Sequence, residues 1–248
     1  MTTLLIDGDI CLYTASVATE FTCNWGDDNW VLSANLTQSK DIASTFIKEL
    51  QVSLQSDQTI ICLTGKHNFR KDLYPDYKSN RKDTRKPIIY NELKAWLTDQ
   101  YDVRTEDGLE ADDLLGILAT SIDHTIIVSA DKDLQCVPGK LFRKGELVTI
   151  TLEEANRFHM LQTLTGDPTD GYPGCKGVGP VGAAKALLGH PEGHWGAVVA
   201  LYEKQGLTEA DALLNARMAY MLRAHNYDFN TKEITHWTPE ITPPILLT

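Results

Sequence analysis

The sequence has few cysteines, no long apolar run and no overall excess of basic residues. Its five cysteines are scattered among 248 residues without a C-x-x-C spacing, which is typical of reduced thiols rather than of a disulfide framework or a zinc site. The apolar run at residues 4–6 is too short for a signal peptide, and no run approaches the length of a membrane span. We therefore expect a cytoplasmic protein without a membrane partner. It is long enough for one large α/β domain, or for a main domain with a small appendage.

The net charge of −11 at pH 7 argues at first against a nucleic-acid partner, because phosphate binding usually shows as a basic surface. The distribution of charge weakens this argument. Residues 66–86 contain eight Lys or Arg and three Asp, a net charge of +5, and are interleaved with Phe69, Tyr74 and Tyr77. A charge run is usually a solvated face, but one that includes aromatic residues is also typical of a nucleic-acid groove.

Acidic residues follow two of the expected strands. Asp7 ends an apolar strand at residues 3–6, and Asp131 and Asp133 come just after the β-branched strand at residues 125–128. The carboxyl ends of the strands in an open α/β sheet meet at one edge, where ligands bind. We therefore expect these three carboxylates to lie near one another.

A further five acids stand in two short motifs. Glu110, Asp112 and Asp113 open an expected helix, where the helix dipole alone also favours acids. Asp167 and Asp170 are three apart in a segment rich in Gly and Pro, so both can turn toward one cation. These eight acids are the candidate metal ligands.

Carboxylates gathered in one site raise one another's pKa unless cations neutralise them. Magnesium prefers oxygen ligands and is commonly bound through a few carboxylates and a substrate phosphate. A pair of ions about 4 Å apart would activate a water and stabilise a leaving oxygen. The sequence shows no histidine triad and no reactive Cys or Ser constellation, so we expect hydrolysis assisted by two Mg²⁺ ions, for which Mn²⁺ substitutes.

A glycine-rich turn follows the last two acids. It leads into an expected helix at residues 180–188 with Lys185 about one turn in. Glycines at this spacing let backbone N–H groups approach a phosphate, and the helix N-terminus faces the same way. The alternative is a surface loop before an ordinary helix. The glycines are Gly174, Gly177, Gly179 and Gly182.

The other expected elements follow from apolar periodicity. Residues 20–36 form an irregular excursion or a hairpin, residues 141–150 a hairpin or bent strand pair, and Thr151 opens a helix toward Leu164 with a capping box. Further helices are expected at 10–18, 42–54, 88–97, 195–205 and 208–224, and a strand at 59–63.

The stretch GDPTDGYPGCKGVGPVGAAKALL resembles the helix-three-turn-helix of the flap endonuclease and 5′→3′ exonuclease superfamily. The strings IDGD, NFRK, YKSNRK, EADD and SADKD, and the tail TEADALLNARMAYMLRAHNYDFNTKEITHW, match in order over most of the chain. Within the superfamily the sequence is most similar to the 5′→3′ exonucleases of short-tailed bacteriophages.

The resemblance implies an α/β fold with a central, mostly parallel sheet flanked by helices, as in PIN and 5′-nuclease domains. It implies a catalytic domain at residues 1–150 and a helical DNA-binding region at 151–248. The implied activity is removal of nucleotides from 5′ ends of duplex DNA, also at nicks, flaps and RNA–DNA primer hybrids, in phage replication, recombination and host DNA breakdown. A monomer, in the host cytoplasm if phage-encoded, and a K⁺ ion at the helix-three-turn-helix are further expectations.

The same match assigns roles to basic residues. Arg70, Lys78 and Arg81 would face the scissile phosphate, with Lys78 stabilising the developing charge. The remaining DNA contacts would come from Lys82, Arg85 and Lys86, and from Gly174, Lys176, Gly177, Gly179, Gly182 and Lys185.

There is one departure from the family pattern. An Asp usually follows the second strand, where this chain has Thr64 and Gly65. Either Asp9 or a water must fill that gap, although Asp9 is by default expected to cap the helix at residues 10–18.

Three other functions compete with this reading. A structure-specific flap endonuclease would use the same residues. A PIN-type single-strand ribonuclease would share the early acids but lack the glycine-rich turn. A non-catalytic DNA-binding module would keep the turn and have no need of the acids, so the retained acids favour a nuclease.

Overall fold

A mostly parallel sheet forms the centre of the structure, which is a computed structural model describing residues 1–82, 84–188 and 194–239. The strands of this sheet lie in the order β5-β4-β1-β6-β7-β8, and among these six described strands only β8 runs antiparallel to its neighbour. They are β1 (Thr3–Asp7), β4 (Gln58–Thr64), β5 (Asp102–Glu106), β6 (Thr125–Val128), β7 (Gly139–Arg143) and β8 (Glu146–Ile150). The predicted fold class is therefore confirmed.

The order in which the strands are added to the sheet reverses beside β1. From β1 the strands progress to β4 and then β5, after which α5 (Ala111–Ser121) carries the chain back to β6 on the other side of β1. The carboxyl ends of β1 and β6 therefore flank the point where strand order reverses, which is where open α/β sheets bind ligands. Asp7 ends β1 at this point.

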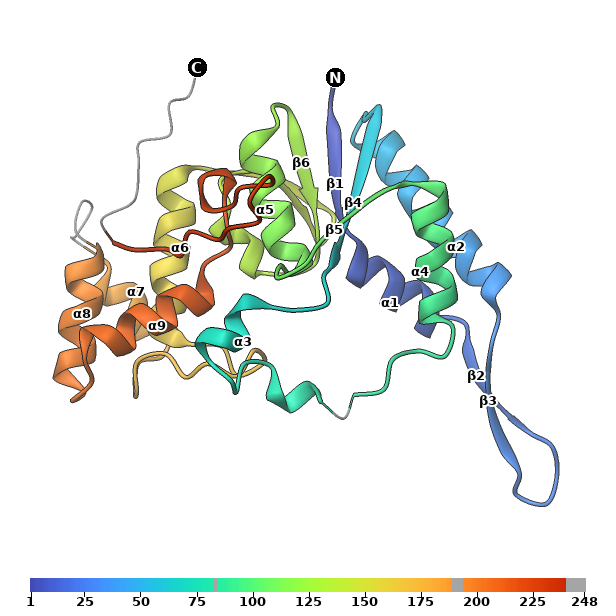
Figure 1. Ribbon diagram of the computed structural model, residues 1–248, viewed down its shortest axis with the longest axis horizontal. Helices are drawn as coiled ribbons and strands as arrows, with labels where there is room; N and C mark the ends of the chain where they lie inside the picture. Colours follow the sequence, from blue (N-terminus) through green and yellow to red (C-terminus); the bar gives the residue numbers. More distant parts are fainter. Residues whose placement is uncertain (83, 189–193, 240–248) are drawn as a thin grey trace.

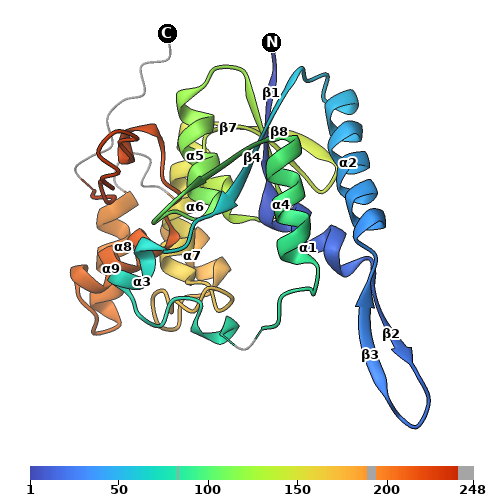
Figure 2. The same ribbon diagram turned by 45° about the vertical axis from the view of Figure 1, so that its right-hand side comes forward.

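Helices cover both faces of the sheet (Figures 1 and 2). Successive residues of β1 point to opposite faces, because side chains alternate along a strand. On one face lie α1 (Gly8–Val17), α2 (Leu36–Ser53) and α4 (Tyr90–Gln100), and Leu4 and Ile6 pack with them in one apolar cluster. On the other face lie α5 and α6 (Leu152–Thr165), and Leu5 packs with them in another cluster.

The C-terminal part is helical. It contains α6, α7 (Pro180–Ala186), α8 (His194–Lys204) and α9 (Glu209–Ala219), which gather on one side of the sheet domain (Figure 1). The predicted domain boundary falls at the end of β8. One apolar cluster crosses it, however, joining Phe69 and Ile117 to Met160 and Tyr202. The two predicted regions therefore share a core, and residues 189–193 and 240–248 of the second lie outside the described part.

Several predicted elements are confirmed and others are new. Residues 20–36 contain a hairpin of β2 (Glu20–Asn24) and β3 (Trp30–Ala34), which projects from the body (Figure 2). Neither β5 nor α3 (Phe69–Leu73) was expected. Helix α9 ends at Ala219, before the predicted residue 224, because Tyr220 adopts an extended backbone. The described residues also contain the short 3₁₀ turns η1 (Ser79–Arg81), η2 (Asp133–Cys136) and η3 (Ala224–Asn226).

One capping prediction is wrong. The carboxylate of Asp7 accepts a hydrogen bond from the backbone N–H of Ile10 at 3.2 Å, so Asp7 caps α1, and Asp9 lies inside the helix.

None of the helices among the described residues is both long and apolar enough to span a membrane.

Candidate active site

Three carboxylates gather where the strand order reverses. Asp7 ends β1, Asp131 lies in the loop after β6, and Asp112 lies in the first turn of α5. The Ser129 hydroxyl donates to Asp7 at 2.8 Å and accepts from the backbone N–H of Asp131 at 3.0 Å, which links two of the three. We call Asp7, Asp112 and Asp131 the first acid group.

The carboxylates of the first acid group disfavour one another's ionised forms. Burial raises the pKa of Asp7 to about 6, and the charges of Asp9 and Asp131 act in the same direction. Burial and the charges of Asp7 and Asp131 raise the pKa of Asp112 well above its usual value. None of the three forms an ion pair with a Lys, Arg or His among the described residues. Within the same part of the chain, the buried Oδ1 of Asp112 has no hydrogen-bond partner.

Lys78 and Tyr77 connect two further acids. Lys78 Nζ lies 2.6 Å from Glu110 Oε1 and 3.6 Å from Asp170 Oδ2. The buried Tyr77 hydroxyl lies 2.9 Å from Glu110 Oε2 and 3.0 Å from Asp170 Oδ2. Burial alone would raise the pKa of Glu110, but Lys78 and Arg70 outweigh it and hold this pKa at about 2. Arg81 Nη2 completes the pairing of Asp170 at 2.8 Å.

Asp133 and Asp167 lie on either side of Lys132. Lys132 Nζ is 2.7 Å from Asp167 and 3.9 Å from Asp133, whose carboxylate also accepts a hydrogen bond from Gln162. Burial, together with the charge of Asp131, raises the pKa of Asp133 to about 7. We call Glu110, Asp133, Asp167 and Asp170 the second acid group; its members, unlike those of the first group, all have basic partners.

Arg70 and Asp113 form a buried pair behind the second acid group, and Arg70 Nη1 also lies 3.5 Å from Glu110 Oε2. Arg70 donates to both oxygens of Asp113, at 2.6 and 2.8 Å, and neither residue has any exposed surface. Asp113 therefore has its oxygens occupied by a guanidinium group. Arg70 has no surface to offer a phosphate, so the geometry contradicts its expected contact with the substrate. The first turn of α5 gives the two neighbouring acids different surroundings, because it points Asp113 inward, to Arg70, and Asp112 toward Asp7 and Asp131.

Asp9 lies beside Thr64, where the Asp that is usual in the family is absent. Its Oδ2 accepts from the backbone N–H of Thr64 at 3.1 Å, and its Oδ1 accepts from the Tyr90 hydroxyl at 3.1 Å. The Thr64 hydroxyl in turn accepts from the backbone N–H of Ala111, at the start of α5, at 3.0 Å. Asp9 therefore links the carboxyl end of β4 to α1 and α4.

The glycine-rich turn divides into a buried and an open part. Gly174 is buried, its N–H donates to Asn215 Oδ1 at 2.8 Å, and a Cβ on it would lie 2.2 Å from Gly166 N. Because this N–H is occupied, Gly174 shapes the turn and does not offer a donor to a phosphate. By contrast Gly177 and Gly179 are exposed, and their N–H groups make no hydrogen bond within the described residues. Lys176, Gly182 and Lys185 are exposed beside them.

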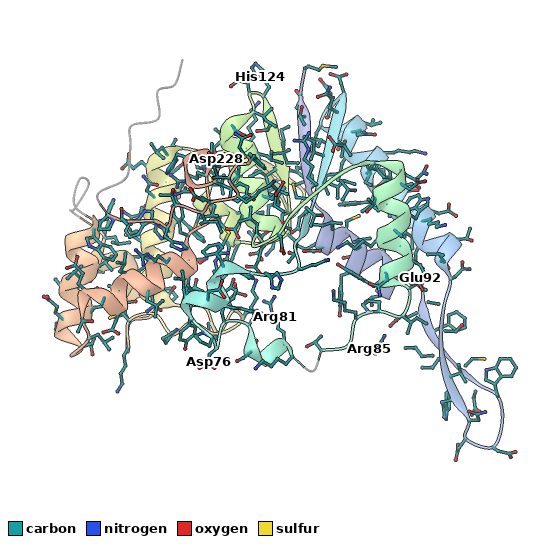
Figure 3. All side chains as sticks on the ribbon, viewed as in Figure 1. Asp76, Arg81, Arg85, Glu92, His124 and Asp228 are labelled. Atoms are coloured by element: carbon teal, nitrogen blue, oxygen red, sulfur yellow. The ribbon has the colours of Figure 1, made fainter. Side chains whose placement is uncertain are left out.

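Basic residues line the connection between α3 and α4. Figure 3 shows Arg81 and Arg85 along this segment. Arg85 is engaged by Glu20 through two hydrogen bonds of 2.9 and 2.7 Å, and Lys86 lies over the Tyr90 ring at 4.6 Å. Lys82 is exposed.

Sequence reasoning missed the uncharged residues of the site. Tyr77 and Ser129 each join two groups of the site, and Gln162 donates to Asp133 from α6. Tyr77 and Ser129 are the first residues of the YKSNRK and SADKD motifs, but neither residue type by itself indicates this role. Gln162 is 29 residues from its partner and carries no local signal.

The donor set fits a hydrated divalent ion. Among the described residues, no three His, Cys, Asp or Glu side chains stand close enough to hold an ion by themselves. Mg²⁺ retains several waters and is usually bound through one or two carboxylates and a substrate phosphate, so a looser set suits it. The unpartnered oxygen of Asp112 and the mutual repulsion within the first acid group are what a cation would relieve.

A mostly parallel α/β sheet with carboxylates clustered at its reversal point is an arrangement suited to metal-assisted hydrolysis of phosphodiesters. The comparison with sequence families is more specific. Residues 2–158 match the family described as 5′-3′ exonuclease, N-terminal resolvase-like domain. The chain belongs to this 5′-3′ exonuclease family and is a nuclease.

Individual relatives agree with this. The chain is 30% identical to an exonuclease of Escherichia phage T7 over 95% of this chain and 93% of the relative. It is 29% identical to an exodeoxyribonuclease of Enterobacteria phage T3, over 95% and 92%. A flap endonuclease of Shewanella pealeana is 31% identical over 48% of this chain and 54% of its own.

Solved structures share the fold at low identity. A bacteriophage T5 protein co-crystallised with metal ions superposes with a TM-score of 0.67 at 16% identity, covering 89% of this chain and 90% of its own. The flap endonuclease of bacteriophage T5, in a complex with DNA and metal ions, gives 0.63 at 17% identity, covering 89% of each.

Proposed function

We propose that the protein removes nucleotides from the 5′ ends of duplex DNA by Mg²⁺-assisted hydrolysis. The single observation that carries this proposal is the first acid group: three carboxylates at the reversal point, without a basic partner in the described structure, one with a buried unpartnered oxygen. Two phage relatives, an exonuclease and an exodeoxyribonuclease, match over more than 90% of their own length and support DNA as the substrate, and the matched 5′-3′ exonuclease family supports the direction.

Metal binding would involve both acid groups. Asp7, Asp112 and Asp131 are assigned to one Mg²⁺ ion, which they would hold partly through the waters that the ion retains. Glu110, Asp133, Asp167 and Asp170 surround the second position, with Lys78 and Lys132 holding their charges when no metal is bound. When bound, the ions would lower the pKa of a water and stabilise the leaving oxygen. Asp113 is left out of the ligand set because Arg70 occupies it.

Lys78 is placed to stabilise charge on the substrate. Its side chain is 16% exposed and lies between Glu110 and Asp170, at the boundary of the second acid group. A phosphate entering there would draw the ammonium group toward its developing negative charge. Arg81, which is 48% exposed beside Asp170, would contact a neighbouring phosphate.

Duplex DNA would bind on the side of α7. The free N–H groups of Gly177 and Gly179, with Lys176 and Lys185, suit contacts to phosphates without reading bases. Lys82, Arg85 and Lys86 would accompany the strand near the acids, once Arg85 leaves Glu20. Action on RNA–DNA hybrids, a K⁺ ion at the glycine-rich turn and a monomeric state belong to the same proposal.

A comparison of substrates tests the proposed function. A duplex labelled at one 5′ end, a nicked duplex and a duplex with a 5′ flap are digested side by side with Mg²⁺. We expect short 5′-labelled products from the duplex and the nick. Products released only from the flap, at its junction, would identify a structure-specific flap endonuclease. Degradation of single-stranded RNA alone would refute the proposal.

A further inference from the structure

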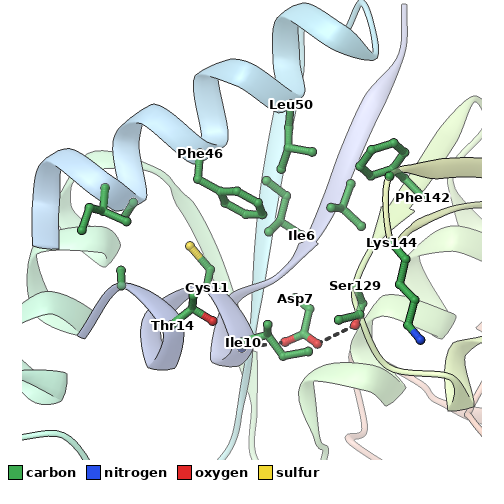
Figure 4. A pocket seen from close by; sticks show the side chains of 16 residues that line it. Ile6, Asp7, Ile10, Cys11, Thr14, Phe46, Leu50, Ser129, Phe142 and Lys144 are labelled. Atoms are coloured by element: carbon green, nitrogen blue, oxygen red, sulfur yellow. Dashed lines mark hydrogen bonds between the residues drawn. The ribbon is translucent and has the colours of Figure 1, made fainter. Parts of the chain in front are cut away.

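An apolar cavity of about 330 Å³ opens beside the first acid group (Figure 4). It lies between α1, α2 and the β7–β8 turn, and its volume is at the lower end of the range of about 300–1,000 Å³ typical of small-ligand pockets. Asp7 and Ser129 belong both to its lining and to the acid site. A molecule in the cavity would therefore lie directly next to the reacting phosphate.

The walls of the cavity are suited to a flat ring. Phe46 enters from α2 and Phe142 from β7, with Ile6 and Leu50 drawn between them and Cys11 beyond Phe46 on α1 (Figure 4). Phe46 is 41% exposed although it is a large apolar residue, so the mouth of the cavity presents an aromatic surface to solvent. Aromatic surfaces of this kind stack on nucleobases irrespective of sequence, because every base has a π-face.

The rim of the cavity carries a positive charge. Lys144 lies in the β7–β8 turn with a φ of 52°, next to Gly145, and both line the cavity. Lys144 is exposed and makes no ion pair within the described residues. Its ammonium group is available for a phosphate attached to whatever fills the cavity. An aromatic cleft with a cation at its mouth has the chemistry of a nucleotide site.

The position of the cavity identifies which nucleotide would enter. Helices α1 and α2 lie on one side of β1, and α6 and α7 lie on the other (Figures 1 and 2). The cavity is lined by α1 and α2, the glycine-rich turn leads from α6 into α7, and Asp7 of the acid site ends β1 between them. A strand whose duplex is held at the glycine-rich turn and whose phosphate lies on the acids would extend toward α1 and α2. The nucleotide beyond the cut, away from the duplex, is the one at the 5′ end.

We propose that this cavity, between Phe46 and Phe142, receives the nucleobase of the 5′-terminal nucleotide that is about to be released. The inference rests on the proposed function. Binding of the base in this cavity favours removal of one nucleotide at a time from a recessed or blunt 5′ end. A single base fills the cavity while the phosphate that links its nucleotide to the next one reaches the acids.

The first experiment leaves the protein unchanged and removes bases from the substrate. Duplexes carry a 5′ phosphate and a tetrahydrofuran residue, which lacks a base, at the first, second or third nucleotide of the cleaved strand. We expect kcat/KM for the first cut to fall roughly 5- to 100-fold when the first base is missing, as for loss of one stacked base. Removal of the third base should change it less than 3-fold. Equal losses at all three positions, or none at the first, would overturn the inference.

The second experiment places the effect at Phe46. Phe46→Ala should lower kcat/KM on the normal duplex by a similar factor, but not on the duplex that lacks the first base. Phe229→Ala is the matched control, because Phe229 has the same 41% exposure and packs edge-on against Tyr227 away from the cavity. If Phe46→Ala lowers activity equally on both substrates, the residue supports the fold and does not bind the base.

A binding measurement separates this inference from the proposed function. Asp131→Asn, which should bind DNA without cutting it, is mixed with a duplex whose first base is the fluorescent analogue 2-aminopurine. We expect a change of fluorescence on binding that disappears with Asp131→Asn combined with Phe46→Ala, and competition by free deoxynucleoside monophosphate only at millimolar concentration. A signal unaffected by Phe46→Ala overturns the cavity assignment even if the enzyme is a 5′→3′ exonuclease. Cleavage of only single-stranded RNA refutes the proposed function itself.

Discussion

Arg70 and Asp113 form a fully buried, two-pronged ion pair, with Nη1 to Oδ2 at 2.6 Å and Nη2 to Oδ1 at 2.8 Å. The guanidinium group also donates to the carbonyls of Met218 and Tyr220, and Asp113 accepts from the backbone N–H of Leu222. The pair therefore fastens the first turn of α5 to the chain that follows α9. Since α5 also carries Asp112, this pair positions the acid site from behind.

Removing one partner of this pair should destabilise the fold strongly. We expect Asp113→Ala to lower the free energy of unfolding by about 3–5 kcal/mol, because it leaves the Arg70 charge buried and unpaired. Urea unfolding without metal measures this. Asp102→Ala is the matched control, since its pair with Arg104 is exposed and should contribute at most about 1 kcal/mol. A loss as small as that of the control would show that the buried pair does not fasten α5.

Asp9 should support the site without binding metal. Asp9→Asn weakens the hydrogen bonds from the Thr64 N–H and the Tyr90 hydroxyl, so we expect a loss of stability of about 1–2 kcal/mol. Tyr90→Phe removes one of these bonds and should cause a smaller loss. The Mg²⁺ concentration for half-maximal activity should stay within twofold in both variants. A much higher Mg²⁺ requirement for Asp9→Asn alone would make Asp9 a ligand.

His159 should make the folded state sensitive to mild acid. Burial lowers the pKa of His159 from 6.5 to about 3, and its Nε2 donates to the Ala216 carbonyl at 2.8 Å. Below pH 6.5 the unfolded chain binds a proton here that the folded chain does not. Stability is therefore lost as pH falls from 6.5 toward 3, by about 1.4 kcal/mol per pH unit from this residue.

The measurement for His159 is urea unfolding at pH 7.5, 6.5, 5.5 and 5.0. We expect His159→Gln to have a shallower decline with falling pH than the unmodified protein. His124→Gln, at an exposed position (Figure 3), should decline in parallel with the unmodified protein. Parallel curves for all three proteins would rule out His159 as the source of the acid sensitivity.

Lys185 should contribute to DNA affinity without sequence preference. Lys185→Ala should weaken binding to all duplex sequences alike and make the log–log salt dependence shallower by about one unit, because one phosphate contact is lost. Lys48→Ala, on the exposed face of α2, should leave both unchanged. Fluorescence anisotropy with three unrelated duplexes at several salt concentrations measures this. A loss confined to one sequence would mean that Lys185 reads bases.

Local sequence patterns predicted those parts of the site that lie at the carboxyl ends of predicted strands. The strand at residues 125–128 has the predicted bounds, and the carboxyl-edge rule correctly indicated that Asp7 and Asp131 would come together. Strand β5 was missed because Asp102, Arg104 and Glu106 interrupt its apolar pattern at the edge of the sheet.

Long-range packing accounts for what the sequence did not indicate. The partner of Asp113 is 43 residues away, and a run of acids at the start of a helix does not reveal which one faces inward. The cap of α1 was misassigned for a similar reason, since Asp7 and Asp9 are equally good capping residues by type. The Gly174 N–H is held by Asn215, which lies 41 residues further along the chain.

The central claim is that the first acid group holds a catalytic metal, and Asp112→Asn tests it most directly. Asp123→Asn, on the exposed turn after α5, is the matched control. Mg²⁺ binding by calorimetry and digestion of a 5′-labelled duplex are measured on both variants, with EDTA and Mg²⁺ add-back. We expect Asp112→Asn to lose activity at least a hundredfold and to bind Mg²⁺ more weakly while still binding DNA. Full activity of Asp112→Asn, or of the unmodified protein in excess EDTA, would contradict the claim.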